Sequence, residues 1–271
     1  MSQPSAVLHP KPMPVLFIGH GSPMNAIEAS TFSRGWEKMA RELPRPRAIL
    51  CISAHWESEG TQVTAMEQPR TIHDFGGFPK ALFDVQYPAP GSPVLAKSIQ
   101  ATLSQAKVGL NLDWGLDHGC WSLLKPMYPK ADIPVVQLSL DVSKSPSEHY
   151  ELAKGLAPLR EQGILILGSG NLVHNLRRMA VKGSDFNEPF GFDWALEANV
   201  LFKKLIKERR HQELADYLTL GEAVQLAVPT PEHFLPLLYI LALQQQQETV
   251  TFFNDQPVAG SLTMTSLIVG H

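Results

Sequence analysis

Three short apolar segments of this chain each end in small residues followed by a histidine. They are residues 15–19 before His20, residues 47–53 before His55, and residues 164–168, which continue through Gly-Ser-Gly-Asn to His174. Continuous apolar runs rich in β-branched residues are typical of strands buried on both faces of a parallel sheet. The carboxyl ends of such strands form the crevice in which ligands bind. The pattern therefore predicts that these histidines gather at one edge of a sheet, as the side chains of a metal site.

Segments with helical and strand patterns alternate along the rest of the chain. The expected helices are residues 32–43, 93–106, 147–161, 194–210, 211–218 and 234–247. The further expected strands are residues 61–66, 134–140, 249–253 and 262–269, with a turn at 254–260 between the last two. This alternation predicts an α/β fold in which a mostly parallel central sheet is flanked by helices. No linker divides the chain, so we expect one catalytic domain over residues 14–271, preceded by a flexible, proline-rich N-terminus over residues 1–13.

The composition favours a protein that acts on small molecules. With 271 residues, 44% of them hydrophobic, the chain can bury a large core without disulfides. Charged residues make up 18%, the formal net charge is -3, and no block of Lys or Arg occurs, which argues against nucleic acid or an anionic membrane as partner. Cys51 and Cys120 show no paired spacing, and no apolar run reaches membrane-spanning length. We therefore expect a cytoplasmic monomer or small homo-oligomer.

Two further histidines, His118 and His233, are candidates for the same site. His118 precedes an expected helix, so it is either a capping or turn residue or part of the pocket. Glu232 and His233 open the expected helix at 234–247, and adjacent helical residues point about 100° apart, so only one of them can face a common centre. An acidic residue in the first turn is favoured by the helix dipole, which leaves His233 as the candidate ligand.

Other features of the sequence concern the shape of the pocket and the exposure of the remaining histidines. The Gly-Ser-Gly-Asn turn before His174 lacks the full dinucleotide fingerprint, and its small residues are expected to make room for a substrate. The long segment 68–93 is rich in Pro, Gly and aromatic residues and is expected to form part of the pocket wall. His73 lies in it. The expected solvent-exposed histidines are His9, His149, His211 and His271.

Five motifs taken together resemble the class III extradiol ring-cleaving dioxygenases, in particular the branch that acts on DOPA. The motifs are His20-Gly-Ser-Pro23, Ser53-Ala-His-Trp56, Asp117-His-Gly119, Gly168-Ser-Gly-Asn-Leu-Val-His174 and Pro229-Thr-Pro-Glu-His233. The resemblance extends from about Pro14 over nearly the whole chain. It implies a non-haem enzyme that inserts both atoms of O₂ into a catechol such as DOPA and releases a muconic semialdehyde type of product.

The resemblance also implies roles for individual residues. His20, His55 and His233 correspond to metal ligands, with Glu232 as the alternative third ligand, because many relatives use a carboxylate there. His174 corresponds to the acid/base histidine and His118 to a histidine beside the bound catechol. We expect Ser22, His73 and Asn171 to contribute to substrate binding.

The sequence is compatible with more than one metal and with more than one function. Imidazole ligands suit both iron and zinc, and three ligands on one side of the ion leave positions open for catechol and O₂. Fe(II) is expected for dioxygenase activity. The Irving–Williams order favours Zn(II), so zinc in the site would not identify the working metal. One alternative function is a zinc-dependent hydrolase on the same scaffold with His174 as general base. A non-catalytic metal-binding protein is another.

Overall fold

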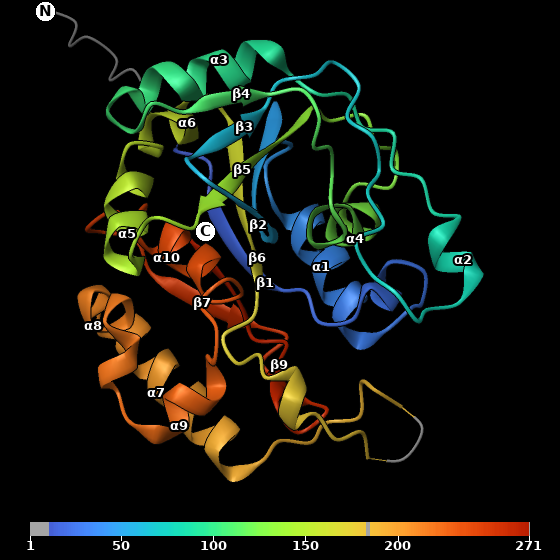
Figure 1. Cartoon of the computed structure of the whole chain (residues 1–271), viewed down its shortest axis with the longest axis vertical. Helices are drawn as coiled ribbons and strands as arrows, with labels where there is room; N and C mark the ends of the chain where they lie inside the picture. Colours follow the sequence, from blue (N-terminus) through green and yellow to red (C-terminus); the bar gives the residue numbers. More distant parts are fainter. Residues whose placement is uncertain (1–10, 183–184, 271) are drawn as a thin grey trace, which may run out of the picture.

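One eight-stranded sheet organises the computed structural model, which describes residues 11–182 and 185–270 (Figure 1). The strand order is β4-β3-β5-β2-β6-β1-β10-β7. The strands are β1 (Val15–Gly19), β2 (Ala48–Ser58), β3 (Gln62–Thr64), β4 (Gly109–Asn111), β5 (Val135–Asp141), β6 (Ile164–Gly170), β7 (Val250–Phe253) and β10 (Ser266–Val269). The four central strands β5, β2, β6 and β1 are mutually parallel, and antiparallel pairs join them to β3 and β10. The predicted mostly parallel sheet is confirmed.

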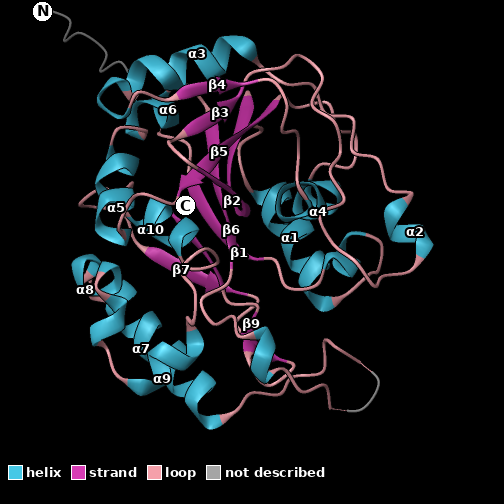
Figure 2. Cartoon of the chain, in the orientation of Figure 1, coloured by secondary structure: helices cyan, strands magenta, loops and turns pink. Residues whose placement is uncertain are grey.

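Helices cover both faces of the sheet (Figure 2). On one face the apolar cluster includes side chains of α1 (Thr31–Glu42), α2 (Lys80–Phe83) and α4 (His118–Met127). The cluster on the other face includes side chains of α3 (Pro93–Thr102), α5 (Pro146–Lys154), α6 (Ala157–Glu161), α7 (Asp193–Lys207), α8 (His211–Ala215), α9 (Glu222–Ala227) and α10 (Leu235–Leu241). Successive residues of β1 alternate between the two clusters, with Leu16 in one and Phe17 in the other. This alternation explains why the central strands are apolar throughout.

Side-chain caps fix where several helices begin. Ser30 accepts a hydrogen bond from the Ser33 backbone N–H at the start of α1, and Ser92 caps α3 ahead of a proline in its first turn. Asp117 caps α4 by accepting from the backbone N–H of Cys120 at 3.1 Å. The capping role considered for His118 therefore belongs to its neighbour, and His118 is the first residue of the helix.

Several expected elements are shorter than their sequence patterns indicate or are divided in two. The helix expected over residues 147–161 is broken between α5 and α6, because Pro158 has no N–H with which to continue a preceding helix. The helix expected over residues 234–247 ends at Leu241, before the glutamines. The strand expected over residues 262–269 is divided into β9 (Leu262–Thr263) and β10, and β9 pairs with β8 (Pro257–Val258) inside the expected turn.

The predicted exposure of two histidines is wrong. His149 is fully buried, with Nδ1 at 2.8 Å from the Tyr239 hydroxyl, and His211 is 8% exposed, with Nδ1 at 3.1 Å from the hydroxyl of Tyr150. Both lie on the inner faces of α5 and α8, where a hydroxyl partner compensates the imidazole for lost water. His9 and His271 lie outside the described residues.

The start of the described chain is anchored to the domain. Residues 1–10 of the expected flexible N-terminus lie outside the described residues, but Met13 is buried. Its carbonyl accepts a hydrogen bond from Nε of the buried Arg160 at 2.8 Å, and its N–H donates to the Arg160 carbonyl at 3.0 Å. In the part of the chain that the structure describes, no helix combines the length and apolarity needed to cross a bilayer.

Candidate metal centre and substrate cavity

The carboxyl ends of three adjacent central strands carry the candidate site. His20 follows β1, His174 follows β6, and His55 lies in β2 where its pairing with β5 is interrupted between Ile52 and Glu57. We expected His55 just beyond its strand, whereas β2 continues past it to Ser58. The interruption leaves the backbone around His55 free of regular pairing with β5, as at bulges that reorient a side chain toward an active site.

His233 reaches this edge from a distant part of the chain because β6 ends in a glycine. A Cβ atom on Gly170 would lie 2.1 Å from the carbonyl oxygen of His233, so any other residue would push the two segments apart. That same carbonyl accepts a hydrogen bond from the backbone N–H of Asn171 at 2.9 Å. The glycine that appeared in the sequence as a space for substrate therefore makes room for the segment preceding α10.

The structure brings His20, His55 and His233 into one cluster. One ring nitrogen from each lies within 4.8 Å of those of the other two, a spacing that allows all three to bind one ion. The Nε2 atoms of His20 and His55 are 3.3 Å apart. His20 and His55 are two of the three strand-end histidines expected to gather here, and the third member of the cluster is His233, from the segment before α10.

The opposite ring nitrogen, Nδ1, faces an oxygen in all three rings. His20 Nδ1 lies 3.0 Å from Ser169 Oγ, which donates its own proton to the Gly119 carbonyl at 2.6 Å and so accepts from the imidazole. His233 Nδ1 is 3.1 Å from Glu232 Oε1, and His55 Nδ1 is 3.5 Å from Asp74 Oδ2. A carboxylate can only accept, so these contacts favour the tautomer with the proton on Nδ1. Each Nε2 then carries a lone pair that is available to an ion, and those of His20 and His55 lie next to each other.

The arrangement fits a divalent cation. With protons on Nδ1, the Nε2 lone pairs of His20 and His55 face each other at 3.3 Å, which is repulsive unless a positive charge lies between them. Burial lowers the pKa of His20 and His233 well below the ordinary value, and burial together with the neighbouring His118 lowers the pKa of His55 to about 3. All three are therefore neutral near pH 7, the form in which imidazole binds metals.

His174 and His118 each pack against a different histidine of the cluster. The His174 ring stacks on His233 with centroids 3.5 Å apart and planes 9° apart, and burial lowers the pKa of His174 to about 4. The His118 ring lies 3.8 Å from that of His55, between centroids. A neutral His174 can accept a proton at neutral pH, as an acid/base group must.

Asp74 is a site residue that the sequence analysis missed. Its Oδ1 accepts from the backbone N–H of His118 at 2.9 Å, and its Oδ2 lies 3.0 Å from His118 Nδ1 as well as 3.5 Å from His55 Nδ1. Burial alone would raise the pKa of Asp74, but contacts with these two histidines outweigh it and lower the pKa. In the sequence, Asp74 follows His73 in the long loop, and an acidic residue at this position could have been predicted to contact a site histidine.

Glu232 has a different role from the one expected. It lies in a turn ahead of α10, not in the first turn of that helix, and its Oε1 accepts from Thr230 Oγ1 at 2.9 Å besides contacting His233 Nδ1. The carboxylate therefore lies at the Nδ1 edge of the His233 imidazole. Glu232 is thus placed to orient His233, whereas His233 faces the common centre.

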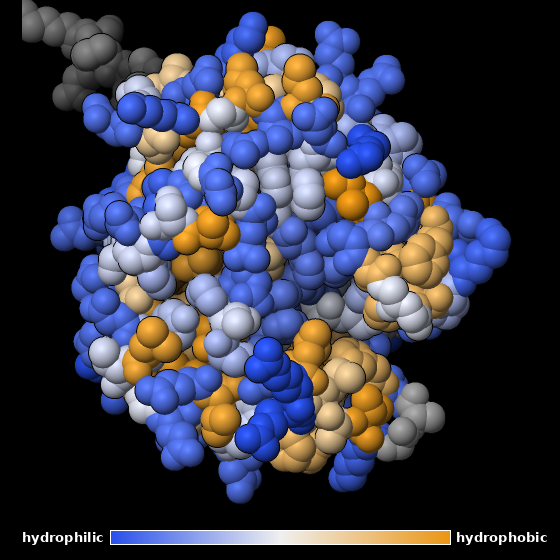
Figure 3. Space-filling view, in the orientation of Figure 1, coloured by the Kyte–Doolittle hydropathy of each residue, from blue (hydrophilic) through white to orange (hydrophobic). Residues whose placement is uncertain are grey.

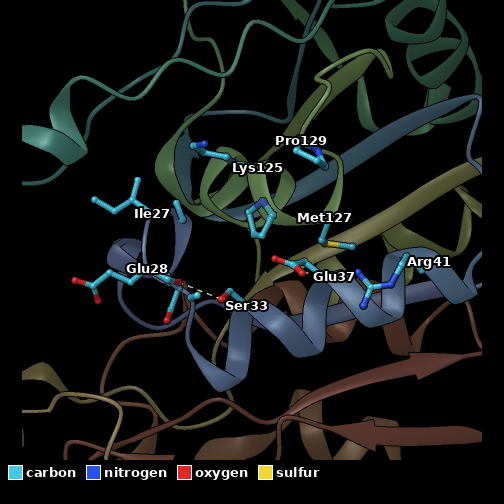
Figure 4. Close-up of a pocket in the computed structure, with 12 residues that line it drawn as sticks. Ile27, Glu28, Ser33, Glu37, Arg41, Lys125, Met127 and Pro129 are labelled. Carbon is cyan, nitrogen blue, oxygen red and sulfur yellow. Dashed lines mark hydrogen bonds and ion pairs between the residues drawn. The ribbon is translucent and has the colours of Figure 1, made fainter.

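A cavity of about 570 Å³ opens over the cluster. Besides the five histidines and Asp74, it is lined by Gly21, Ser22, Pro23, Met24, Phe75, Phe78, Leu176, Met179, Phe186 and Leu262. The long loop supplies Asp74, Phe75 and Phe78, as expected for a pocket wall. The groove between α1 and α4 in Figure 4 is similar in volume, about 590 Å³, but none of its lining residues is a histidine.

The structure does not bring two of the expected substrate-binding residues to this cavity. Nε2 of His73 lies 2.9 Å from the Val85 carbonyl, and the ring packs near Trp121. Asn171 is buried and donates from Nδ2 to the Thr263 carbonyl at 2.8 Å. Both side chains hold loops together, while Ser22 lines the cavity as expected.

Known proteins resemble this chain in both sequence and fold. A family model described as the catalytic LigB subunit of aromatic ring-opening dioxygenase matches residues 9–262. The chain belongs to this family. The resemblance to class III extradiol dioxygenases is confirmed, and the protein is an extradiol catechol dioxygenase of the metal-dependent LigB family. The zinc-hydrolase alternative finds no support.

Relatives of this dioxygenase occur in bacteria and plants. The chain is 48% identical over 261 residues to an Escherichia coli protein named 4,5-DOPA dioxygenase extradiol, with 95% of each chain covered. It is 40% identical over 227 residues to a Beta vulgaris protein of the same name, covering 82% of this chain and 83% of the relative. A crystal structure of an uncharacterized E. coli protein superimposes with a TM-score of 0.82 at 43% identity, covering 95% of this chain and all of that one.

Proposed function

We propose that His20, His55 and His233 hold one divalent metal ion, Fe(II) in the active enzyme. The observation that carries this proposal is that one ring nitrogen of each histidine lies within 4.8 Å of those of the other two, while Nδ1 of each ring faces an oxygen. Imidazole donors suit Fe(II) and Zn(II) alike, and oxygen chemistry requires the redox-active one. When bound, the ion supplies a template on which catechol and O₂ meet and electrons pass between them.

His174 is the group that we propose to move the substrate proton. It lines the cavity, is neutral near pH 7 and lies beside His233. An imidazole at this position can take the proton of a catechol hydroxyl and return it later in the reaction. Removal of such a group typically slows turnover by about 10²–10⁴-fold.

His118, whose ring lies beside that of His55, is proposed to orient the reacting atoms. Asp74 lies against its Nδ1, which favours the tautomer with the proton there and leaves Nε2 as an acceptor for a substrate hydroxyl. Because Asp74 also contacts His55, one carboxylate fixes both a ligand and a substrate-orienting ring. Such outer contacts commonly set ligand orientation and basicity.

The proposed substrates are catechols, DOPA among them because two relatives carry that name. The test is O₂ uptake and visible absorbance of the product after anaerobic loading with Fe(II), using catechol, 4-methylcatechol and DOPA. We expect one O₂ consumed per ring and a muconic semialdehyde type of product. Absence of uptake with every catechol, in protein shown to contain one Fe(II) per chain, would contradict the proposal.

The cytoplasm is the proposed location. Cys51 and Cys120 are both buried free thiols, a state that reducing compartments preserve. Subcellular fractionation of the native host tests this, and recovery of the protein outside the cytoplasm would contradict it. The monomer or small homo-oligomer expected from the sequence remains a prediction, to be measured by light scattering.

A further inference from the structure

The mouth of the substrate cavity combines apolar and cationic side chains. Three segments wall this cavity: the 3-10 helix after β1, the loop between β3 and α2, and the loop between β6 and α7. The last of these loops supplies Leu176 and Met179 to the wall and also carries Arg177, Arg178 and Lys182. In Figure 3, strongly hydrophilic surface lies directly beside apolar surface where Figure 1 shows the short yellow helical turn next to β9. Cations therefore lie at the edge of an apolar wall.

The mouth turn, residues 176–179, separates these side chains by face. It begins as a 3-10 helix, in which residues three positions apart lie on the same side. Leu176 and Met179 are three apart and both line the cavity, although they are 58% and 44% exposed. Arg177 and Arg178 lie between them and are exposed. Two guanidinium groups therefore flank the place where the apolar wall meets solvent.

The mouth turn is anchored to the domain at both ends. Before it, the buried Asn175 donates from its backbone N–H to the Ser261 carbonyl at 3.1 Å and from Nδ2 to the Leu226 carbonyl at 2.8 Å. After it, the Ala180 N–H donates to the Ala259 carbonyl at 3.0 Å. The backbone that carries the two arginines is thus fixed before any ligand binds, which reduces the entropy lost on binding.

Neither arginine of the mouth turn has a partner within the described part of the protein. Over residues 11–182 and 185–270, the side chain of every other arginine contacts a carbonyl or carboxylate oxygen. Over the same residues, Arg177 and Arg178 form no ion pair and no side-chain hydrogen bond. The acidic residues of their loop, Asp185 and Glu188, line a different groove together with Arg34. The two guanidinium groups are therefore available to an anion from solution.

A carboxylate suits these groups in charge and in shape. The planar guanidinium fork matches a carboxylate and forms two parallel hydrogen bonds with it. A catechol held by its hydroxyls at the histidines directs a ring substituent away from them, along Leu176 and Met179 toward the mouth. Exposed apolar side chains around a pocket are typical of surface that a bound molecule covers. A carboxylate at the end of such a substituent reaches the rim on which the arginines lie.

We propose that Arg177 and Arg178 bind the carboxylate of the ring substituent, so that the enzyme selects catechols with an acidic side chain over uncharged or purely cationic ones. The inference rests on the proposed function, since the histidines must hold the catechol hydroxyls. DOPA and 3-(3,4-dihydroxyphenyl)propionate both carry the required carboxylate. The ammonium of DOPA has no part in this contact, so the propionate, which lacks it, belongs to the same selected class.

Two matched pairs of catechols test the selection. DOPA and dopamine differ by a carboxylate, and 3-(3,4-dihydroxyphenyl)propionate differs from 4-propylcatechol by a carboxylate in place of a methyl group. Dissociation constants are measured anaerobically by calorimetry on Fe(II)-loaded protein, and kcat/KM by O₂ uptake. We expect the acid of each pair to be preferred about tenfold, and the preference to weaken as salt is added. If dopamine and 4-propylcatechol equal or exceed their acids, the inference is overturned.

Matched arginine variants assign the preference to the mouth turn. In the double variant Arg177→Gln/Arg178→Gln, we expect the ratio of kcat/KM for the propionate to that for 4-propylcatechol to fall about tenfold, and the single variants divide this effect between the two residues. Arg47→Gln removes the same charge just before β2, at the opposite edge of the sheet, and should leave the ratio unchanged. An unchanged ratio in the double variant overturns the inference.

The outcomes separate this inference from the proposed function. Fe(II)-loaded protein that binds catechols without consuming O₂ contradicts the proposed function alone, and the dissociation constants of the two pairs then decide the inference. Protein that turns over all four catechols without preferring the acids contradicts the inference alone. Protein that binds no catechol contradicts both.

Discussion

Asp74 holds His118 by two atoms at once, with Oδ1 accepting from its backbone N–H at 2.9 Å and Oδ2 lying 3.0 Å from its Nδ1. The loop between β3 and α2 is thereby tied to the first residue of α4. Because Oδ2 also lies 3.5 Å from Nδ1 of His55, the position of this loop and the orientation of two site histidines depend on one carboxylate.

Asp74→Asn should weaken the site without disturbing the fold. The amide oxygen can still accept from the His118 backbone, but the negative charge facing the two imidazoles is gone. We expect metal affinity or kcat to fall by about 10–100-fold, the usual effect of removing an outer carboxylate. Chelator competition and steady-state kinetics measure the two quantities. Asp84→Asn changes an exposed carboxylate paired with Lys80 and serves as control. If Asp74→Asn retains both, the carboxylate has no orienting role.

His20→Ala should abolish tight metal binding. It removes one of three converging nitrogens and leaves Ser169 Oγ without its imidazole partner. Elemental analysis of purified, reconstituted protein is expected to show far less than one metal per chain. In His73→Ala, which lies outside the cavity, metal content should stay at the wild-type level. Full occupancy in His20→Ala would exclude it as a ligand.

His174→Ala should retain metal and lose turnover. Its ring stacks on His233 but is not one of the three converging rings, so we expect unchanged metal content and a kcat about 10²–10⁴-fold lower. Imidazole added to the assay should restore part of the rate, which a purely structural defect would not allow. A wild-type kcat in this variant would remove His174 from the mechanism.

The burial of His149 should make stability depend on pH. Burial lowers its pKa from 6.5 to about 4, so between these values the unfolded chain binds the proton and the folded protein does not. The resulting stabilisation is complete above pH 6.5 and is lost as the pH falls toward 4, amounting to about 3 kcal/mol. In His149→Gln, urea unfolding should show a pH dependence weaker by about this amount. Parallel pH curves for the two proteins would contradict the prediction.

Much of the fold could be predicted from local pattern. Parallel strands buried on both faces produce apolar runs such as residues 164–168, and their carboxyl ends meet whatever follows each run in the chain. His20, His55 and His174 could therefore be placed together before any tertiary contact was known. Short elements without a strong period, such as β4 and α9, were not expected.

Exposure was harder to predict for polar residues on helices. A histidine in a helix has the same local sequence signature whether it faces water or a buried hydroxyl. His149 and His211 are buried because α5 and α8 turn those faces toward Tyr239 and Tyr150, which are far away in the sequence. Only packing of the helices decides which face is inside.

The sequence by itself determined the central strands, the histidines that follow them and the family, because each depends on residues that are neighbours in the chain. Tertiary structure decided that Asp74 stands behind His118, that Glu232 stands behind His233, and that three separate segments wall the cavity. Asp74 and His118 are 44 positions apart, and the wall segments come from separate parts of the chain, whereas Glu232 and His233 are neighbours brought to the centre together by the turn before α10. The formation of these contacts depends on how loops return over the sheet, which no local period encodes.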